Sequence, residues 1–169
     1  TPLINALQRL VSENYVEYHP QRGYGIRKFN LEEMNQLHRV REACEGVAAY
    51  DACNWITDEQ VKELRAFFEP FLEVSDWEPE VMRRYQEADL AFHQRIIEIS
   101  NNPFIKQALD HLGILYFTYQ WGLLQSPATG IKDHLLIIHH LSARDHQAAR
   151  AAMEKHLMKG RENIAHYFN

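Results

Sequence analysis

The sequence predicts an all-α fold, an antiparallel bundle of six helices preceded by one helix and a β-hairpin. Three observations support this prediction. The chain has 169 residues, 46% of them hydrophobic, with only 7 glycines and 6 prolines, so it can bury an ordinary core. Everything after residue 30 reads as helical segments that begin at capping residues or prolines and are joined by short connections. Runs of β-prone residues stand out only near the N-terminus, at residues 15–18 and 24–29.

The first 29 residues are predicted to form a helix followed by a hairpin. Thr1 and Pro2 are an N-cap and a first-turn proline, and Asn14 ends the helix because asparagine tolerates a left-handed conformation. Between them the apolar residues share one helical face: Leu3, Ala6, Leu7, Leu10 and Val11. The two β-prone runs flank residues 19–23, a turn with proline, glycine and a basic tip, which is typical of a hairpin.

Six helices are predicted in the rest of the chain. Asn30 and Glu33 form a capping-box pattern that starts the first, and Thr57 and Gln60 start the second. Pro70 is expected to end or kink that second helix. The expected ranges are 31 to about 53, 57 to about 70, 79–100, 103 to about 125, 132–142 and 146–167, with Asp145 capping the last. The stretch 126–130 is the only one that resembles a linker.

The charge pattern divides the chain into a slightly basic start and an acidic remainder. The net charge of −5 argues against a protein that coats nucleic acid. Residues 1–30 hold four basic and two acidic residues, a net charge of +2, so the remaining residues carry −7. This asymmetry suggests different tasks for the two parts.

Membrane and secretory segments are not expected from the sequence. The most apolar run, residues 112–124, is shorter than the roughly 20 residues that a membrane-spanning helix needs. The first residues lack a basic region followed by an apolar stretch. Cys44 and Cys53 stand nine residues apart in one predicted helix, about 13 Å, which is too far for a disulfide. We therefore expect free thiols and a cytoplasmic protein.

Four side chains are candidates for one metal site. Asp89 and His93 are four residues apart in a predicted helix, so they share one face. If the turn between the last two helices is centred near Asp145, His134 lies eleven residues before it and His156 eleven residues after it. In an antiparallel helix hairpin both then lie about 16 Å from the turn, at the same height.

One carboxylate and three imidazoles suit a borderline divalent ion. Four such ligands close a tetrahedral zinc site, whereas octahedral nickel or manganese would keep two positions for water or another oxygen donor. The alternative is a buried polar network without metal. Spacing alone leaves both interpretations open.

Several motifs, taken in order, resemble those of one family of bacterial regulators. The N-terminal set is Thr1-Pro2-x-x-x-Ala6-Leu7-x-x-Leu10, Tyr15-Val16 and Pro20-Gln-Arg22-Gly23. The later set is Arg41-Glu-Ala-Cys-Glu45, Asp89-Leu-Ala-Phe92-His93, Asn101-Asn102-Pro103, Asp133-His134 and His156-Leu157. The first set resembles the back half of the winged helix-turn-helix of GntR-family regulators. The second resembles the FadR-type effector domain, called FCD.

This resemblance implies a homodimeric transcription regulator. Residues 1–29 would be the C-terminal part of the winged helix-turn-helix, and residues 30–169 an all-helical domain that dimerises and binds an effector, usually a small organic or sugar acid. In metal-binding members of the family, four positions ligate the ion: Asp89, His93, His134 and His156. Zinc is the first choice of metal, with nickel or manganese as alternatives. The implied partners are operator DNA, the acid and a second copy, with no membrane.

The resemblance also indicates which residues contact the effector and the DNA. The effector candidates are Arg41, Tyr116, Tyr119 and Gln120, with Trp121 beside them. For Arg41 the alternative is a salt bridge to Glu45 one turn later, and for the aromatic residues it is a place in the core. The DNA candidates are Thr1 as a phosphate ligand, Arg22 in the minor groove, and Gly23 at the hairpin tip.

The sequence departs from the family pattern in three places. It begins within what resembles the recognition helix, so we expect the front half of the DNA-binding domain to lie outside it and operator binding by this segment to be weak. Ile4-Asn5 stands where the family commonly has Arg-Glu, and Arg144-Asp145 stands where it has Gly-Asp.

Two other functions compete with that of a regulator. A carboxylate and three histidines around an ion with open positions could activate water in a metal-dependent enzyme acting on a small carboxylate. However, Glu87 and Glu98 are poorly placed on their helix to serve as its general base. An acyl-CoA-type sensor without metal would need apolar volume where these polar side chains converge. The sequence therefore favours a regulator over an enzyme.

Overall fold

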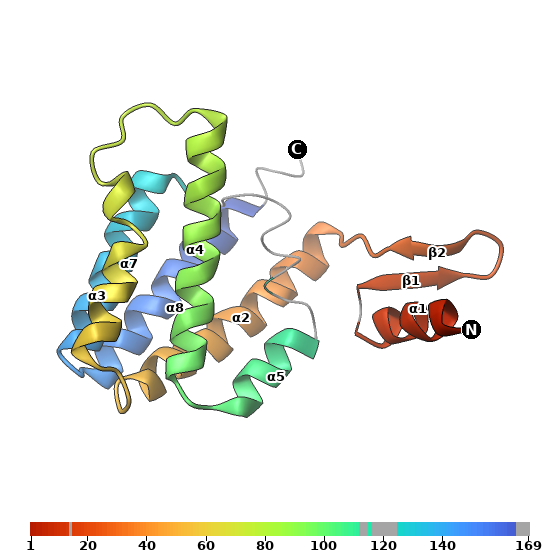
Figure 1. The fold of residues 1–169 in the computed structure, drawn as a ribbon, viewed down its shortest axis with the longest axis horizontal. Coiled ribbons are helices and arrows are strands. Elements are labelled where there is room, and N and C mark those ends of the chain that lie inside the picture. The colour runs from red at the N-terminus through yellow and green to blue at the C-terminus, as the bar shows by residue number, and fades with distance from the viewer. Residues whose placement is uncertain (14, 112–114, 116–124, 165–169) are drawn as a thin grey trace.

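The computed structural model describes residues 1–13, 15–111, 115 and 125–164. It confirms the predicted fold class, a helical bundle preceded by a helix and a two-stranded hairpin. The first helix and the hairpin project from one side of the bundle and are joined to it by the long helix α2 (Figure 1). We refer to residues 1–29 as the head and to the helices that follow as the bundle.

The head contains the helix α1 (Pro2–Ser12) and the strands β1 (Val16–His19) and β2 (Gly23–Ile26). The strands pair antiparallel, with His19 opposite Gly23 at the turn. Gly23 has a φ of +79°, a left-handed conformation that glycine adopts without steric cost. The predicted hairpin is confirmed, although its second strand ends at Ile26 rather than at residue 29.

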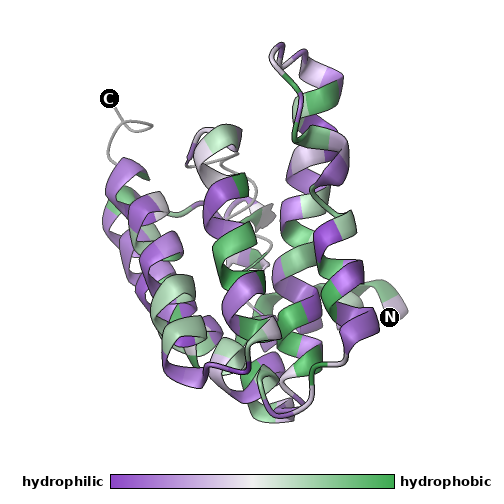
Figure 2. Ribbon diagram, turned by 90° about the vertical axis from the view of Figure 1, so that its left-hand side faces the viewer, coloured by the Kyte–Doolittle hydropathy of each residue, from purple (hydrophilic) through white to green (hydrophobic). Residues whose placement is uncertain are grey.

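The bundle contains α2 (Leu31–Ala52), α3 (Asp58–Ala66), the 3₁₀ helix η1 (Glu69–Phe71), α4 (Pro79–Ile99), α5 (Pro103–His111), α7 (Pro127–Ser142) and α8 (His146–Asn163). Helix α8 packs against both α2 and α7, and α2 also packs against α4. Apolar and polar bands alternate along these helices (Figure 2), as expected for amphipathic helices that bury one face.

Capping side chains start the helices where the sequence predicts them. Asn30 and Glu33 form the capping box of α2, and Thr57 and Gln60 form that of α3. The Asp145 carboxylate accepts a hydrogen bond from the N–H of Ala148 at 3.0 Å and so caps α8. Because each cap satisfies a backbone N–H that the helix itself leaves without a partner, these residues fix where the helices begin.

One predicted linker is wrong. Residues 126–130 form the start of α7: the Ser126 hydroxyl accepts a hydrogen bond from the N–H of Thr129, and Pro127 lies in the first turn. Serine is a favoured N-cap residue and proline is favoured in the first turn of a helix, so this pair marks a helix start. Helix α7 therefore begins five residues before the predicted position. The expected continuation of α5 towards residue 125 lies largely outside the described residues.

The main apolar core lies inside the bundle. Its largest fully buried side chains are aromatic: Phe68, Tyr85 and Phe92. A smaller cluster of Phe29, Met34 and Ile164 joins the start of α2 to the end of α8, next to the head. None of the helices in the described ranges is both long and apolar enough to span a membrane.

Candidate metal centre

Three helices of the bundle bring four metal-ligating side chains together in its interior. Asp89 and His93 come from α4, His134 from α7 and His156 from α8. Each is buried, and each offers one ligand atom within 4.8 Å of the other three. Asp89 and His93, four residues apart on α4, therefore lie in the same cluster as His134 and His156, which are equally far from the α7–α8 turn.

The atom spacings within the cluster fit ligands of a single ion. The Nε2 atoms of His134 and His156 are 3.1 Å apart, and His134 Nε2 lies 3.2 Å from Asp89 Oδ1. Two ligand atoms at about 2.0–2.1 Å from one ion, at angles between octahedral and tetrahedral, are themselves about 2.8–3.4 Å apart. His93 Nε2 lies 4.0 Å from Asp89 Oδ2, and this buried nitrogen has no hydrogen-bond partner in the described part of the chain. A cation would satisfy it.

The cluster environment keeps two of its histidines neutral. Burial lowers the pKa of His134 well below its ordinary value, and the neighbouring His156 and His93 lower it further. Burial also lowers the pKa of His156, against the opposite effect of a hydrogen bond with Asp133. The neutral imidazole is the form that binds metal.

Carboxylates hold the far sides of two of the imidazoles. Glu45 on α2 is fully buried, and one of its oxygens is hydrogen-bonded to Nδ1 of His93 while the other accepts from Nε of Arg41 at 2.5 Å. Burial raises the pKa of Glu45, but Arg41 and His93 outweigh it and hold the pKa at about 2. Asp133 Oδ2 lies 3.6 Å from Nδ1 of His156, and Lys159 neutralises Asp133 from 2.7 Å. Such partners orient metal-binding histidines.

Aromatic side chains close the cluster on its apolar side. Phe68 stacks on His134 with ring centroids 4.4 Å apart, and Phe92 contacts the same ring at 4.6 Å. A Cβ at Gly130 would lie 2.4 Å from the Tyr85 hydroxyl, so only a glycine leaves room for that buried ring beside α7. These contacts exclude water from one face of the cluster.

The other predicted site residues are distributed as follows. Arg41 is 6% exposed and pairs with Glu45, the alternative that its spacing raised. The predicted effector residues Tyr116, Tyr119 and Gln120, with Trp121, lie outside the described residues. Thr1 is exposed at the start of the head, and its side chain makes no capping hydrogen bond. Arg22 is exposed at the hairpin turn, next to Gly23 in the sequence. The head candidates therefore lie in a different part of the molecule from the four buried ligands (Figure 1).

The sequence reasoning missed the role of Glu45. It identified Glu45 only as the possible partner of Arg41, since the two are one turn apart. The contact with His93 joins residues 48 positions apart on α2 and α4, a distance that helical periodicity does not address. The signal available was the charge itself, because a glutamate on the buried face of a helix is almost never without a partner.

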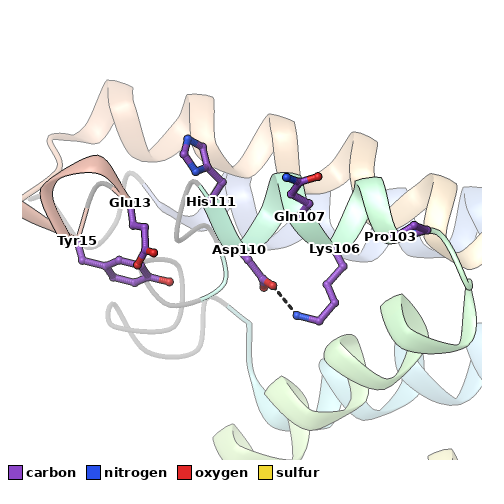
Figure 3. A pocket seen from close by; sticks show the side chains of 7 residues that line it. All are labelled: Glu13, Tyr15, Pro103, Lys106, Gln107, Asp110 and His111. Carbon is purple, nitrogen blue, oxygen red and sulfur yellow. Dashed lines mark hydrogen bonds and ion pairs between the residues drawn. The ribbon is translucent and has the colours of Figure 1, made fainter. Parts of the chain in front are cut away.

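A cavity at the surface lies between the head and α5 (Figure 3). This cavity has a volume of about 440 Å³. It is lined by Glu13, Tyr15, Pro103, Lys106, Gln107, Asp110 and His111. Its charged side chains already have partners, since Lys106 pairs with Asp110 at 2.5 Å and Glu13 pairs with Arg9 at 2.8 Å. Lys106 and Asp110 are both more than half exposed. It is a solvated crevice at the junction of head and bundle.

The chain is similar in sequence to known transcription regulators. Residues 36–159 match the FCD domain family. The HTH-type transcriptional repressor RspR of Escherichia coli K12 is 23% identical over 171 residues, which is 96% of this chain and 72% of RspR. The Nta operon transcriptional regulator of Aminobacter aminovorans is 25% identical over 164 residues, which is 97% of this chain and 77% of that protein.

Solved structures share the fold. E. coli McbR/YncC has a TM-score of 0.77 at 21% sequence identity, over 98% of this chain and 82% of that one. A GntR transcriptional regulator from Rhodococcus sp. RHA1 has a TM-score of 0.71 at 18% identity, over 97% and 79% of the two chains. Because both matches cover nearly the whole chain, the shared fold includes the head as well as the bundle.

Proposed function

Since the chain belongs to the FCD domain family of GntR-type transcriptional regulators and is not an enzyme, we propose that its bundle binds a divalent metal ion and a small carboxylic acid, and that this binding alters operator affinity. The metal ligands are Asp89, His93, His134 and His156. Binding of the acid and of the operator would then be linked energetically in both directions, as for any two ligands that favour different states of one protein.

The observation that carries this proposal is the buried convergence of one carboxylate and three imidazoles. Burying four polar side chains costs free energy unless each finds a partner. Their ligand atoms lie within 4.8 Å of one another, and one of them, Nε2 of His93, has no protein partner in the described ranges. A divalent cation provides all four with a partner at once, which a purely hydrogen-bonded network of these groups does not.

The charge of the ligand set supports an anionic effector. Asp89 is the only anionic side chain among the four ligands, so a divalent ion here keeps a net charge of +1. When bound, the ion supplies a positive centre for an oxygen donor of the acid. Arg41, which Glu45 anchors near His93, is the proposed second contact for a carboxylate. Zinc is the first candidate because four nitrogen and oxygen ligands suit it, and nickel and manganese are the alternatives.

The head is proposed to contribute to DNA binding. Thr1, Arg22 and Gly23 are exposed there or lie at the hairpin turn, in keeping with the predicted phosphate and minor-groove contacts. In this proposal residues 1–29 and 30–169 form separate domains, the regulator acts as a homodimer, and it works in the cytoplasm, where the operator is.

The first test is the metal content of protein purified without a histidine tag. We expect about one divalent ion per chain, and we expect His134→Ala and His156→Ala to lose it, because each removes a ligand. His139→Ala is the matched control, since His139 lies on the same helix but is exposed. Elemental analysis gives the stoichiometry. An absence of metal in the wild type, even after incubation with zinc, nickel or manganese, would reduce the cluster to a polar network.

The second test addresses the acid. Citrate and gluconate serve as probes, and the melting temperature of the metal-loaded protein is measured by calorimetry with and without them. We expect at least one class of acid to raise Tm, because a ligand that binds only the folded state stabilises it. Arg41→Lys should reduce that rise, since lysine cannot make a bidentate contact. A Tm that neither citrate nor gluconate changes would contradict the sensor proposal for these two classes of acid.

A further inference from the structure

The carboxylate of Glu45 connects two helices at the edge of the candidate metal centre. Glu45 lies on α2 with 0% exposure, and its side chain reaches both Arg41 on its own helix and His93 on α4. The two oxygens have separate tasks, because Oε1 accepts from Nε of Arg41 and Oε2 is bonded to Nδ1 of His93. A buried carboxylate with both oxygens engaged is not a solvated surface charge.

The bond to Glu45 sets which nitrogen of His93 carries the proton. An ionised carboxylate only accepts hydrogen bonds, so Nδ1 of His93 must be the donor. In a neutral imidazole the other nitrogen, Nε2, then has a lone pair. That nitrogen is the atom that His93 directs towards Asp89, and it is buried without a hydrogen-bond partner in the described residues. The contact on one side of the ring therefore prepares the other side to bind a cation.

Arg41 neutralises the buried carboxylate of Glu45. An uncompensated carboxylate with no exposure would be strongly destabilising, and the guanidinium one helical turn away neutralises it. Arg41 takes the oxygen that His93 does not use. The side chain at position 45 must therefore accept two hydrogen bonds from two donors at once. A carboxylate can do this, whereas a glutamine has one accepting oxygen and one donating NH₂ group.

We propose that Glu45 is a positioning residue of the metal centre, which fixes the Nδ1–H tautomer of His93 and orients its ring so that Nε2 faces the ion. This inference rests on the proposed function for the presence of the ion, but its first consequence concerns the metal-free protein. In the metal-free protein the tautomer of His93 already depends on Glu45.

The test compares three variants by imidazole ¹⁵N NMR of the metal-free chain and by competition for zinc with a chromophoric chelator. In Glu45→Gln the charged Arg41 takes the amide oxygen, so the NH₂ group faces Nδ1 of His93. We expect the ring to change to the Nε2–H tautomer, and zinc affinity to fall about 10- to 100-fold, as for the loss of other outer partners of metal-binding histidines. In Arg41→Met the Glu45 contact remains, and the tautomer stays Nδ1–H.

The double variant Arg41→Met with Glu45→Gln separates positioning from a merely structural role. Without the competing guanidinium, the amide oxygen of glutamine is available to His93. We expect recovery of the Nδ1–H tautomer and of most of the zinc affinity. This variant also lacks an unpaired buried charge, so it keeps the test valid if Glu45→Gln alone does not fold. Glu42→Gln is the control, because Glu42 pairs with Arg161 and contacts none of the four ligands.

Two results would overturn the proposal. One is an Nδ1–H tautomer and unchanged zinc affinity in Glu45→Gln, and the other is a double variant that recovers neither property. Failure of the proposed function has a different signature. In that case the wild type takes up no metal, while the tautomer of metal-free His93 still responds to Glu45.

Discussion

An arginine and a glutamate four residues apart form an ion pair in the head and another in the bundle, through the same atoms. In α1, Nε of Arg9 donates to Oε1 of Glu13 at 2.8 Å. In α2, Nε of Arg41 donates to Oε1 of Glu45 at 2.5 Å. The first pair has side-chain exposures of 79% and 31%, and the second has 7% and 1%. The two pairs use the same atoms at the same sequence spacing, but the first is exposed to water and the second is buried.

This contrast extends to the apolar residues of the two regions. None of the residues of α1, all of which the structure describes, is buried, and Leu3 is 69% exposed. Where the structure describes it, the bundle instead encloses eight polar or charged residues together with its apolar core. Because water competes with exposed contacts and is excluded from buried ones, equal contacts have unequal consequences. The main apolar core and the candidate metal ligands therefore both lie in the bundle.

The largest predicted effect compares an aromatic residue of the bundle with an apolar residue of the head. Phe92 is fully buried against Phe68 and His134, so Phe92→Ala leaves a cavity. We expect it to lower the free energy of unfolding by about 3–5 kcal/mol. Leu3→Ala removes an exposed side chain and should change it by less than about 0.5 kcal/mol. Urea denaturation of the metal-free chain measures both. A comparable loss for Leu3→Ala would mean that α1 is packed.

The next effect compares the two ion pairs directly. Arg41→Met keeps most of the side-chain volume but leaves Glu45 buried without its cation. We expect a loss of about 3 kcal/mol in unfolding free energy, as for other broken buried pairs. Arg9→Met makes the same change on the surface of the head and should be indistinguishable from the wild type. Equal effects of the two substitutions would refute the argument that burial, and not geometry, decides the value of the pair.

The smallest effect concerns pH and the buried histidine His38. Burial, together with the nearby Arg41, lowers the pKa of His38 from 6.5 to about 3. Its two ring nitrogens have no hydrogen-bond partner in the described part of the molecule. Between pH 6.5 and 3 the unfolded chain therefore binds a proton here that the folded chain does not. The stability that neutral His38 contributes is complete above pH 6.5 and is lost as the pH falls towards 3.

From pH 7 to pH 5 this linkage amounts to about 2 kcal/mol of unfolding free energy. We expect the wild type to lose that much more stability over the interval than His38→Leu, as measured by urea titrations at the two pH values. His19→Leu, at an exposed histidine of the hairpin, is the matched control and should keep the acid sensitivity of the wild type. If His38→Leu is as acid-sensitive as the wild type, His38 does not contribute this linkage.

Local signals in the sequence were sufficient for most of the fold. Capping boxes at Asn30 and Thr57 and the cap at Asp145 act within four residues, so they can be recognised from the sequence alone. The same local rule holds at Ser126 and Pro127, which start α7. The prediction of a linker there is wrong because it rests on the glycine and proline of this stretch and not on its serine cap. The continuation of α5 towards residue 125 and the predicted effector residues there stay predictions.

The candidate centre was predictable as far as helical geometry reaches. Asp89 and His93 follow from one helix, and His134 and His156 follow from a hairpin with a known turn. Glu45 did not follow, because its contact with His93 depends on how α2 packs against α4. Asp133 and Lys159 likewise meet across α7 and α8. Sequence patterns position residues along an element, but the packing of elements decides which charges become buried together.

The short α7–α8 turn also restricts how the sequence can change in length. His134 and His156 are 22 residues apart, and each helical residue advances a side chain by about 1.5 Å and rotates it by about 100°. A single insertion or deletion in either helix between a ligand and the turn would therefore direct one imidazole away from the other. Exposed positions in this interval can be substituted, whereas its length and its buried positions, such as Ile137 and Met153, are constrained. Among related sequences, an unchanged interval between these two histidines is thus a stricter marker of the centre than overall identity.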